Sequence, residues 1–165
     1  MSENANTKDR DTRSPDDGTS APHSDLDDFL CFAVYEANLA FNHLYRSLLE
    51  EIGLTYPQYL VMTLLWRQNE RTVKEIGEAL SLEYNTLTPM IKRLETMGLV
   101  TRVRDRVDQR VVKVSLTKAG SDLEERARQV PECVAEASGL SQKAFNDLKA
   151  SLTELRSNIR KTETH

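Results

Sequence analysis

The sequence lacks both the long apolar runs and the many cysteines that mark membrane and disulfide-bonded proteins. No apolar run approaches the roughly 18 residues that a membrane-spanning helix needs. The N-terminus is polar and has no apolar core of a signal peptide. Two cysteines, Cys31 and Cys133, are too few for a disulfide scaffold. We therefore expect a cytoplasmic protein with no membrane partner, whose thiols are structural, reactive or redox-sensing.

The beginning of the chain also lacks apolar side chains. Residues 2–25 contain no Leu, Ile, Val, Met or aromatic residue, and Pro15, Gly18 and Pro22 stand among small polar residues. Such a segment cannot bury enough apolar surface to offset the entropy of ordering it. We expect residues 1–24 to form a disordered acidic tail.

Positive charge is not in excess, because the formal net charge of the whole chain is -4. Taken whole, this value argues against binding to a polyanion. The first 28 residues, however, hold eight acidic and three basic side chains, so the rest of the chain is close to neutral. Basic residues must therefore be concentrated in one region if they are to attract a polyanion.

A long first helix is predicted from about Ser24 to Gly53. Ser24 and Asp27 resemble a capping box at its start, and Gly53 ends it. Its apolar residues repeat at helical spacing and extend over two faces, so we expect it to pack on its own domain and on a partner subunit. The residues of the first stripe are Leu26, Phe29, Leu30, Ala33, Ala37, Ala40, Leu44 and Leu48, and those beyond it are Phe32, Tyr35, Leu39 and Phe41.

Two further capping boxes mark helix starts in the middle of the chain. Thr55 and Gln58, with Pro57 in the first turn, predict the start of a largely buried helix. Thr72 and Glu75 predict the start of a short helix that ends at about residue 80.

Another helix follows a tight turn at residues 81–83 and ends at Gly98. Its start is left open by the sequence. Pro89 costs no hydrogen bond if Thr86 is the N-cap, but it would disturb a helix that begins at Glu83.

Two stretches of alternating, β-branched residues, 99–104 and 111–116, predict a hairpin. Helix, tight turn, helix and hairpin, in this order, are typical of a winged helix-turn-helix. Two more helices are expected at about 118–130 and 141–160, with Cys133 in the segment between them. We therefore expect a mainly α fold with a small β-hairpin wing.

Polar and basic residues gather on the second helix of this unit and on the hairpin. Side chains near the N-terminus of such a helix meet base edges, and an arginine at a wing tip can enter the narrow, negative minor groove. Asp108 is spaced to orient Arg110 by an ion pair. The alternative is that these charges merely solvate a surface hairpin. The candidate DNA-binding residues are Asn85, Thr86, Thr88, Pro89, Lys92, Arg93, Arg104, Arg106, Asp108 and Arg110.

The segment Asp108-Gln109-Arg110, followed by Leu116-Thr117, resembles the wing signature of the MarR family of winged-helix repressors, D-x-R then L-T. Other segments resemble the organic hydroperoxide resistance regulators (OhrR) within that family. These segments are Phe29-Leu30-Cys31-Phe32 with Tyr35, Leu54-Thr55-Tyr56-Pro57-Gln58-Tyr59-Leu60, and Leu87-Thr88-Pro89-Met90.

The resemblance implies a homodimer that binds a pseudo-palindromic operator in double-stranded DNA. Residues 25–162 would form one MarR-like domain, with dimerisation helices at 25–52 and 118–162 and a winged-helix region at 55–117. It implies that Cys31 senses organic hydroperoxides. Cys133 would be the resolving thiol of a two-cysteine member, joining Cys31 of the other subunit.

Peroxides react with a thiolate rather than a thiol, so a sensor needs groups that stabilise the anion. By the resemblance, Tyr45 and Tyr56 would donate phenolic hydrogen bonds to the thiolate, with Tyr35 one turn away from Cys31. We expect no cofactor, no metal and no catalytic turnover.

Other interpretations stay open. A lone cysteine on an apolar helix is usually buried and inert, and the tyrosines could be ordinary core residues. The protein could then be a MarR-type repressor released by a non-covalent aromatic ligand. A thiol peroxidase or a helical interaction module without DNA is disfavoured by the basic wing and by the lack of a Cys-x-x-Cys pair.

Overall fold

The chain forms two compact units, residues 1–36 and 37–165, in a computed structural model that describes residues 26–162. The first unit contains a 3-10 turn, η1 (Leu26–Asp28), and the start of helix α1 (Leu30–Glu50), which continues into the second unit. The predicted acidic tail and the predicted helix cap at Ser24 lie outside the described residues.

The observed first helix, α1, begins later in the chain than the apolar pattern predicted. The Phe29 N–H donates to the Leu26 carbonyl at 3.0 Å, which is the tighter i→i−3 bond of a 3-10 turn, and α1 begins only at Leu30. Its C-terminal end agrees with the prediction, because Gly53 has a φ of 70° and the Leu54 N–H reaches back to the Leu49 carbonyl.

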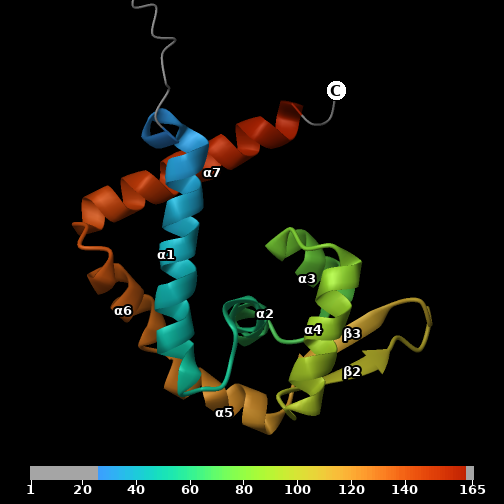
Figure 1. Ribbon diagram of the computed structural model, residues 1–165. Helices are drawn as coiled ribbons and strands as arrows, with labels where there is room; N and C mark the ends of the chain where they lie inside the picture. Colours follow the sequence, from blue (N-terminus) through green and yellow to red (C-terminus); the bar gives the residue numbers. More distant parts are fainter. Residues whose placement is uncertain (1–25, 163–165) are drawn as a thin grey trace, which may run out of the picture. The chain divides into compact units, whose positions relative to one another are not determined.

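The second unit holds the winged-helix elements and the C-terminal helices. Figure 1 shows the β2–β3 hairpin beside α4, with its turn pointing away from the helices. After α1, the elements are α2 (Tyr56–Arg67), β1 (Arg71–Thr72), α3 (Val73–Leu80), α4 (Tyr84–Thr96), β2 (Val100–Arg104), β3 (Val112–Leu116), α5 (Lys118–Ala127), α6 (Val130–Ala137) and α7 (Gln142–Thr162).

Both predicted capping boxes of this unit are present. At α3, the Thr72 N–H donates to the Glu75 carboxylate at 2.7 Å, and the Glu75 N–H donates to the Thr72 hydroxyl at 3.1 Å. At α2, the Thr55 N–H donates to Gln58 Oε1 at 2.9 Å. Each box satisfies N–H groups that have no partner inside their helix, and so fixes where that helix starts.

Helix α4 begins earlier than one of the two predicted alternatives. Glu83 is the N-cap, its carbonyl accepts from the Leu87 N–H at 3.0 Å, and Pro89 lies inside the helix. Proline there removes one i→i−4 hydrogen bond. Leu87 and Ile91 on the same helix are fully buried, and their burial offsets the lost bond.

The hairpin is the outer part of a three-stranded antiparallel sheet with the order β1-β3-β2. Both predicted strands are confirmed, and Arg102 pairs with Val114 across them. Strand β1, which pairs Arg71 with Val114, was not predicted. Two residues are too few to show the alternation that identifies a strand.

Glycine is required where α5 crosses the start of β2. A Cβ atom on Gly120 would lie 2.0 Å from the Leu99 carbonyl oxygen. The Gly120 carbonyl also accepts a hydrogen bond from Trp66 Nε1 at 2.8 Å, and the Thr117 hydroxyl caps α5 from the other side. These contacts join the sheet to α2 and α5 around the buried core.

The segment that contains Cys133 was expected to separate two helices but is itself a helix, α6. Helix α5 ends at Ala127, and Pro131 lies in the first turn of α6, where a missing N–H costs nothing. Val130 and Val134 bury the inner face of α6. Cys133 is therefore half-buried on a helix rather than on a loop.

We expect the box at α3 to make the stability of this unit sensitive to acid. The hydrogen bond from the Thr72 N–H, and then that from the Thr72 hydroxyl, lower the pKa of the Glu75 carboxyl from its ordinary 4.5. A lowered folded-state pKa stabilises the protein above the unfolded-state pKa, and this stabilisation is lost as pH falls through the folded-state value. Glu75→Gln should lower the Tm by about 2 °C at pH 7 and make less difference at pH 3.

Circular-dichroism melts across pH 3–7 measure this difference. Glu78→Gln is the matched control, because the Glu78 carboxylate pairs with Lys74 at 3.8 Å and caps no helix. An equal effect of both substitutions at every pH would contradict the assignment.

Candidate DNA interface and thiol site

The turn between α3 and α4 has the tight geometry of a helix-turn-helix. Ser81 is left-handed, with a φ of 57°, and the Leu82 N–H donates to the Gly77 carbonyl at 2.9 Å. A Cβ atom on Gly77 would already lie 3.0 Å from the Leu82 carbonyl oxygen, so the two helices can approach only with a small residue there. This turn presents the N-terminal end of α4 at the surface.

Helix α4 has one face in the core and one face at the surface. Leu87, Ile91 and Leu94 are fully buried. The hydroxyl oxygen of Thr88 is buried without a hydrogen-bond partner, so in this structure it faces the protein. The candidate residues of α4 that are exposed are Asn85, Thr86, Pro89, Lys92 and Arg93.

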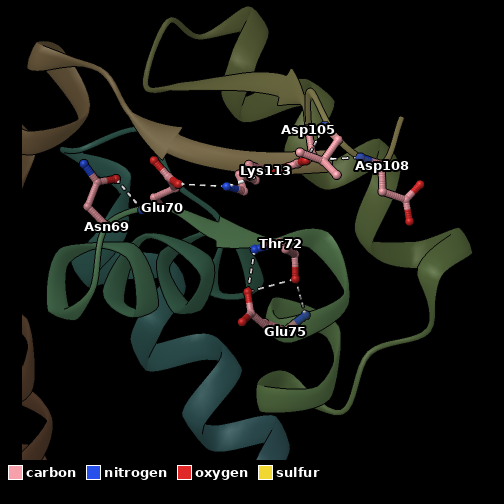
Figure 2. A network of polar contacts seen from close by, with 8 residues as sticks. Asn69, Glu70, Thr72, Glu75, Asp105, Asp108 and Lys113 are labelled. Atoms are coloured by element: carbon pink, nitrogen blue, oxygen red, sulfur yellow. Dashed lines mark hydrogen bonds and ion pairs between the residues drawn. The ribbon is translucent and has the colours of Figure 1, made fainter. Parts of the chain in front are cut away.

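Acidic side chains shape the turn between β2 and β3, residues 105–111, which we call the wing turn. Asp105 Oδ1 accepts from the N–H groups of Val107 at 2.8 Å and Asp108 at 3.2 Å (Figure 2). These bonds, that from Val107 first, lower the pKa of Asp105. Asp108 Oδ1 accepts from the backbone N–H of Arg110 at 2.9 Å.

The predicted ion pair between Asp108 and Arg110 is therefore wrong. The Asp108 carboxylate binds the backbone of Arg110, because a turn leaves N–H groups unpaired and a short acidic side chain reaches those two residues ahead of it. The guanidinium of Arg110 stays exposed and, within residues 26–162, has no ion pair.

Some basic side chains of the hairpin bind other residues of the chain, whereas others do not. Arg102 is paired with Glu95, with Nη2 to Oε2 at 2.7 Å, and Arg104 donates to the Gln109 carbonyl at 3.3 Å. Arg106 and Arg110 are exposed, and neither side chain makes a hydrogen bond or ion pair in the described part of the chain. These two guanidinium groups are therefore available to a polyanion.

An open groove of about 430 Å³ separates the wing from the helix-turn-helix. Lys74, Tyr84 and Arg110 lie on its walls. Tyr84, the first residue of α4, is 64% exposed. Glu75 and Glu78 line it as well, so the groove between the two parts that are expected to contact DNA holds a phenol and charges of both signs.

In the first unit, Cys31 is the second residue of α1 and its side chain is exposed. Phe32 and Tyr35 lie beside it along the chain with ring centroids 6.3 Å apart, and Leu30 is 63% exposed. Within a single chain, the Cys31 thiol is therefore not buried.

In the second unit, Tyr45 and Tyr56 stack with ring centroids 4.1 Å apart, and Tyr59 lies 6.0 Å from Tyr45. Burial, and then the neighbouring Tyr56, raise the pKa of Tyr45 to about 12. Burial also raises the pKa of Tyr56. Both hydroxyl groups therefore stay protonated at neutral pH and are hydrogen-bond donors rather than anions.

A family model described as the transcriptional regulator SarA/Rot matches residues 43–126. The organic hydroperoxide resistance transcriptional regulator of Bacillus subtilis (strain 168) is 43% identical over 127 residues, which are 77% of this chain and 84% of that protein. The structure of reduced AbfR of Staphylococcus epidermidis bound to DNA matches with a TM-score of 0.70 and 37% identity, over 79% of this chain and 90% of that one. Disulfide-formed AbfR matches with a TM-score of 0.57 and 39% identity, over 76% and 88% of the two chains.

The chain belongs to the MarR/SarA family of winged-helix transcriptional regulators. The predicted family is thus confirmed, as is the mainly α fold with a small wing. The part of the MarR/SarA-type chain that matches the family model includes the helix-turn-helix and the wing.

The structure describes Cys133 of this MarR/SarA-type regulator in the second unit. It is half-buried as the fourth residue of α6, and its N–H donates to the Gln129 carbonyl at 3.0 Å. Both cysteines are free thiols in this single chain. The assignment of Cys133 as a resolving thiol stays a prediction.

Residues 26–162 contain neither a candidate metal-binding cluster nor a candidate membrane-spanning helix. No group of three or more His, Cys, Asp or Glu side chains there could hold a metal ion. No helix in the same range is long and apolar enough to cross a membrane.

Three residues that shape the interface of this regulator, Glu70, Asp105 and Lys113, received no individual role from the sequence. Asp105 organises the wing turn, and Lys113 forms ion pairs with both Asp105 and Glu70. The spacing of Asp105 from Val107 and Asp108 is that of a turn-forming aspartate, which could have been recognised. No local spacing connects Glu70 with Lys113.

Proposed function

We propose that this regulator is a dimeric repressor that binds double-stranded DNA and is released when an organic hydroperoxide oxidises Cys31. The observation that carries the proposal is the exposed thiol of Cys31 at the start of α1. It occurs in a chain that is 43% identical to a regulator named for organic hydroperoxide resistance. We also propose that it acts in the cytoplasm, without enzymatic turnover.

The DNA-binding part of the proposal assigns α4 to the major groove and the wing to the minor groove. Exposed Asn85 and Thr86 would meet base edges, and Lys92 and Arg93 would meet phosphates or guanines. The unpaired guanidinium groups of Arg106 and Arg110 would supply the wing contact. The contacting residues of α4 and the wing would be held in place by the remaining candidates, which are Thr88, Pro89, Arg104 and Asp108.

The thiol chemistry needs one hydroperoxide for each oxidised Cys31. The thiolate attacks the outer oxygen, the O–O bond breaks, and the alkoxide leaves as an alcohol after taking a proton, so sulfur becomes a sulfenic acid. The Cys133 thiol of the partner subunit would then attack that sulfur. An S–S bond forms, and the S–O oxygen leaves as water.

Three tyrosines would assist this first step. Tyr45 lies 14 residues along α1 from Cys31, about 21 Å away, so it cannot reach the thiolate of its own chain. Tyr45 and Tyr56 of the partner subunit would therefore donate hydrogen bonds to the thiolate, and Tyr35 would do so from one turn along α1. A phenol keeps its proton at neutral pH and can therefore donate such a bond. Position 31 also lies near the positive end of the α1 dipole, which attracts an anion.

The homodimer is supported by apolar side chains that the single chain leaves exposed in residues 26–41 and 140–159. Such patches are typical of surfaces that a partner covers. They comprise Leu26, Phe29, Leu30, Val34, Tyr35, Leu39, Phe41, Leu140, Leu148, Leu152 and Ile159.

A second candidate function is release by a non-covalent aromatic ligand. It is favoured by an apolar groove of about 440 Å³ in the second unit, where Phe41, Leu44, Val134 and Leu148 are among the lining residues. This size and lining suit a small aromatic compound. A phenolic ligand would then release DNA without any change in the covalent state of Cys31.

Fluorescence anisotropy of a labelled operator duplex tests the proposed function. The reduced protein should bind with an affinity that falls steeply with salt. A stoichiometric organic hydroperoxide should release the duplex, and a dithiol reductant should restore binding. Release by phenolic compounds alone, with indifference to hydroperoxide, would favour the second candidate instead.

A further inference from the structure

Lys113 stands between two carboxylates that come from distant parts of the chain. Its Nζ lies 3.3 Å from Glu70 Oε1 and 3.2 Å from Asp105 Oδ2, as Figure 2 shows. Glu70 precedes β1, whereas Asp105 begins the wing turn. One ammonium group therefore joins the helix-turn-helix side of the sheet to the first residue of the wing turn.

The position of Glu70 is set by its backbone. Glu70 has a φ of 62°, a left-handed conformation that residues other than glycine rarely adopt. Asn69 holds it there, because Asn69 Oδ1 accepts from both the Glu70 N–H and the Leu116 N–H at 2.9 Å. The carboxylate is thus presented from a turn that is tied to the end of β3.

Asp105 uses its two oxygens for two different tasks. Oδ1 accepts from the N–H groups of Val107 and Asp108 and so shapes the wing turn, whereas Oδ2 pairs with Lys113. The side chain is only 23% exposed. Any movement of the wing turn relative to β3 must therefore stretch either these hydrogen bonds or the ion pair.

Lys113 has a neighbour on each of the other two strands of the sheet. It lies on the central strand β3, opposite Thr72 of β1 and Val103 of β2. Its neighbour Val114 is fully buried, which fixes the strand in the core and directs Lys113 to the other face. The hydrogen bonds that the Lys113 ammonium donates to Asp105 and then to Glu70 raise the pKa of Lys113.

We propose that Lys113 is a positioning residue that braces the wing turn against Glu70, so that Arg106 and Arg110 are presented to DNA in one orientation. This inference rests on the proposed DNA-binding function. In this proposal, Lys113, Glu70 and Asp105 raise the affinity and specificity with which the wing binds DNA, although none of the three contacts DNA itself.

A different explanation would be that Lys113 simply binds a phosphate. The two explanations differ in the sign of one effect. Removing the negative charge of Glu70 should strengthen binding to a polyanion if only overall charge matters. If Glu70 holds the brace, its removal should weaken binding.

The test compares duplex affinities of Lys113→Met, Lys113→Arg, Glu70→Gln and the double variant Glu70→Gln/Lys113→Met. We expect Lys113→Met to bind the duplex about tenfold more weakly and Glu70→Gln about two- to threefold more weakly than the unaltered protein. Lys113→Arg should bind within about twofold of the unaltered protein. These effects are of the size expected for exposed ion pairs. The double variant should be no weaker than Lys113→Met, because the brace is lost only once.

Asp122→Asn is the matched control for charge removal, because its carboxylate is about as exposed as that of Glu70 and belongs to an i,i+4 pair with Lys118 on α5. It should bind DNA as tightly as the unaltered protein or slightly more tightly. Tighter binding by Glu70→Gln as well, together with additive effects in the double variant, would overturn the proposal.

A second readout does not depend on DNA. Steady-state ¹⁵N relaxation of the Arg106 to Gln109 amides should show greater motion in Lys113→Met than in the unaltered protein, and no change in Arg110→Ala. Unchanged relaxation in Lys113→Met overturns the brace. If the unaltered protein fails to bind any operator duplex while this relaxation change occurs, the proposed function fails but the brace stands.

Discussion

Cys31→Ser should abolish release from DNA by organic hydroperoxide while leaving the affinity of the reduced protein within about twofold. A serine hydroxyl is nearly isosteric with the thiol but cannot form a sulfenic acid, so the covalent change on which release depends is lost. The side chain is exposed, so little packing changes. The measurement is duplex anisotropy before and after one equivalent of hydroperoxide.

Cys133→Ser is the informative companion variant. If Cys133 resolves the oxidised thiol, this variant should still respond to hydroperoxide but should form no covalent dimer. Its response should be reversed by reductant less completely, because a sulfenic acid that finds no second thiol can oxidise further. Full hydroperoxide release by Cys31→Ser would show that another residue senses the oxidant.

Arg110→Ala should weaken operator binding by at least about tenfold, since one lost arginine contact is worth about 1–3 kcal/mol and a dimer carries two wings. The guanidinium is exposed and unpaired in the described chain, and Asp108 orders the backbone beside it at 2.9 Å. The removed cation should also reduce the slope of log affinity against log salt.

Arg128→Ala provides the matched control for the loss of an exposed arginine. Arg128 lies just after α5 and pairs with Glu125, away from the wing turn. We expect its duplex affinity to stay within about twofold of the unaltered protein. Equal losses in the two variants, or no loss in Arg110→Ala, would contradict the assignment of the wing to DNA.

Local sequence chemistry was sufficient to predict most helix boundaries. The boxes Thr55–Gln58 and Thr72–Glu75 involve residues three apart, and such hydrogen bonds need no tertiary structure. The start of α4 could not be chosen in advance, because the cost of Pro89 is offset by core packing that the sequence does not display. Helix α6 was missed because it has only eight residues and its first turn, which contains Pro131, follows directly on the predicted end of the preceding helix at about residue 130.

The candidate site could be predicted as a set of residues but only partly as an arrangement. Cys31 was identified by resemblance, and its exposure is a property of the folded chain. The stacking of Tyr45 on Tyr56 joins α1 to α2. The bridge from Glu70 through Lys113 spans 43 residues of sequence, and only the β1–β3 pairing brings its ends together.

The most direct test of a thiol switch is the intact mass of the purified, reduced protein after one equivalent of an organic hydroperoxide, under denaturing and non-reducing conditions. We predict a covalent dimer that reverts to monomer with reductant and is absent in Cys31→Ser. A monomer that carries only added oxygen would keep Cys31 as the sensor and remove Cys133 from the mechanism. An unchanged monomer mass would contradict oxidation of Cys31 and leave a repressor released by a non-covalent ligand.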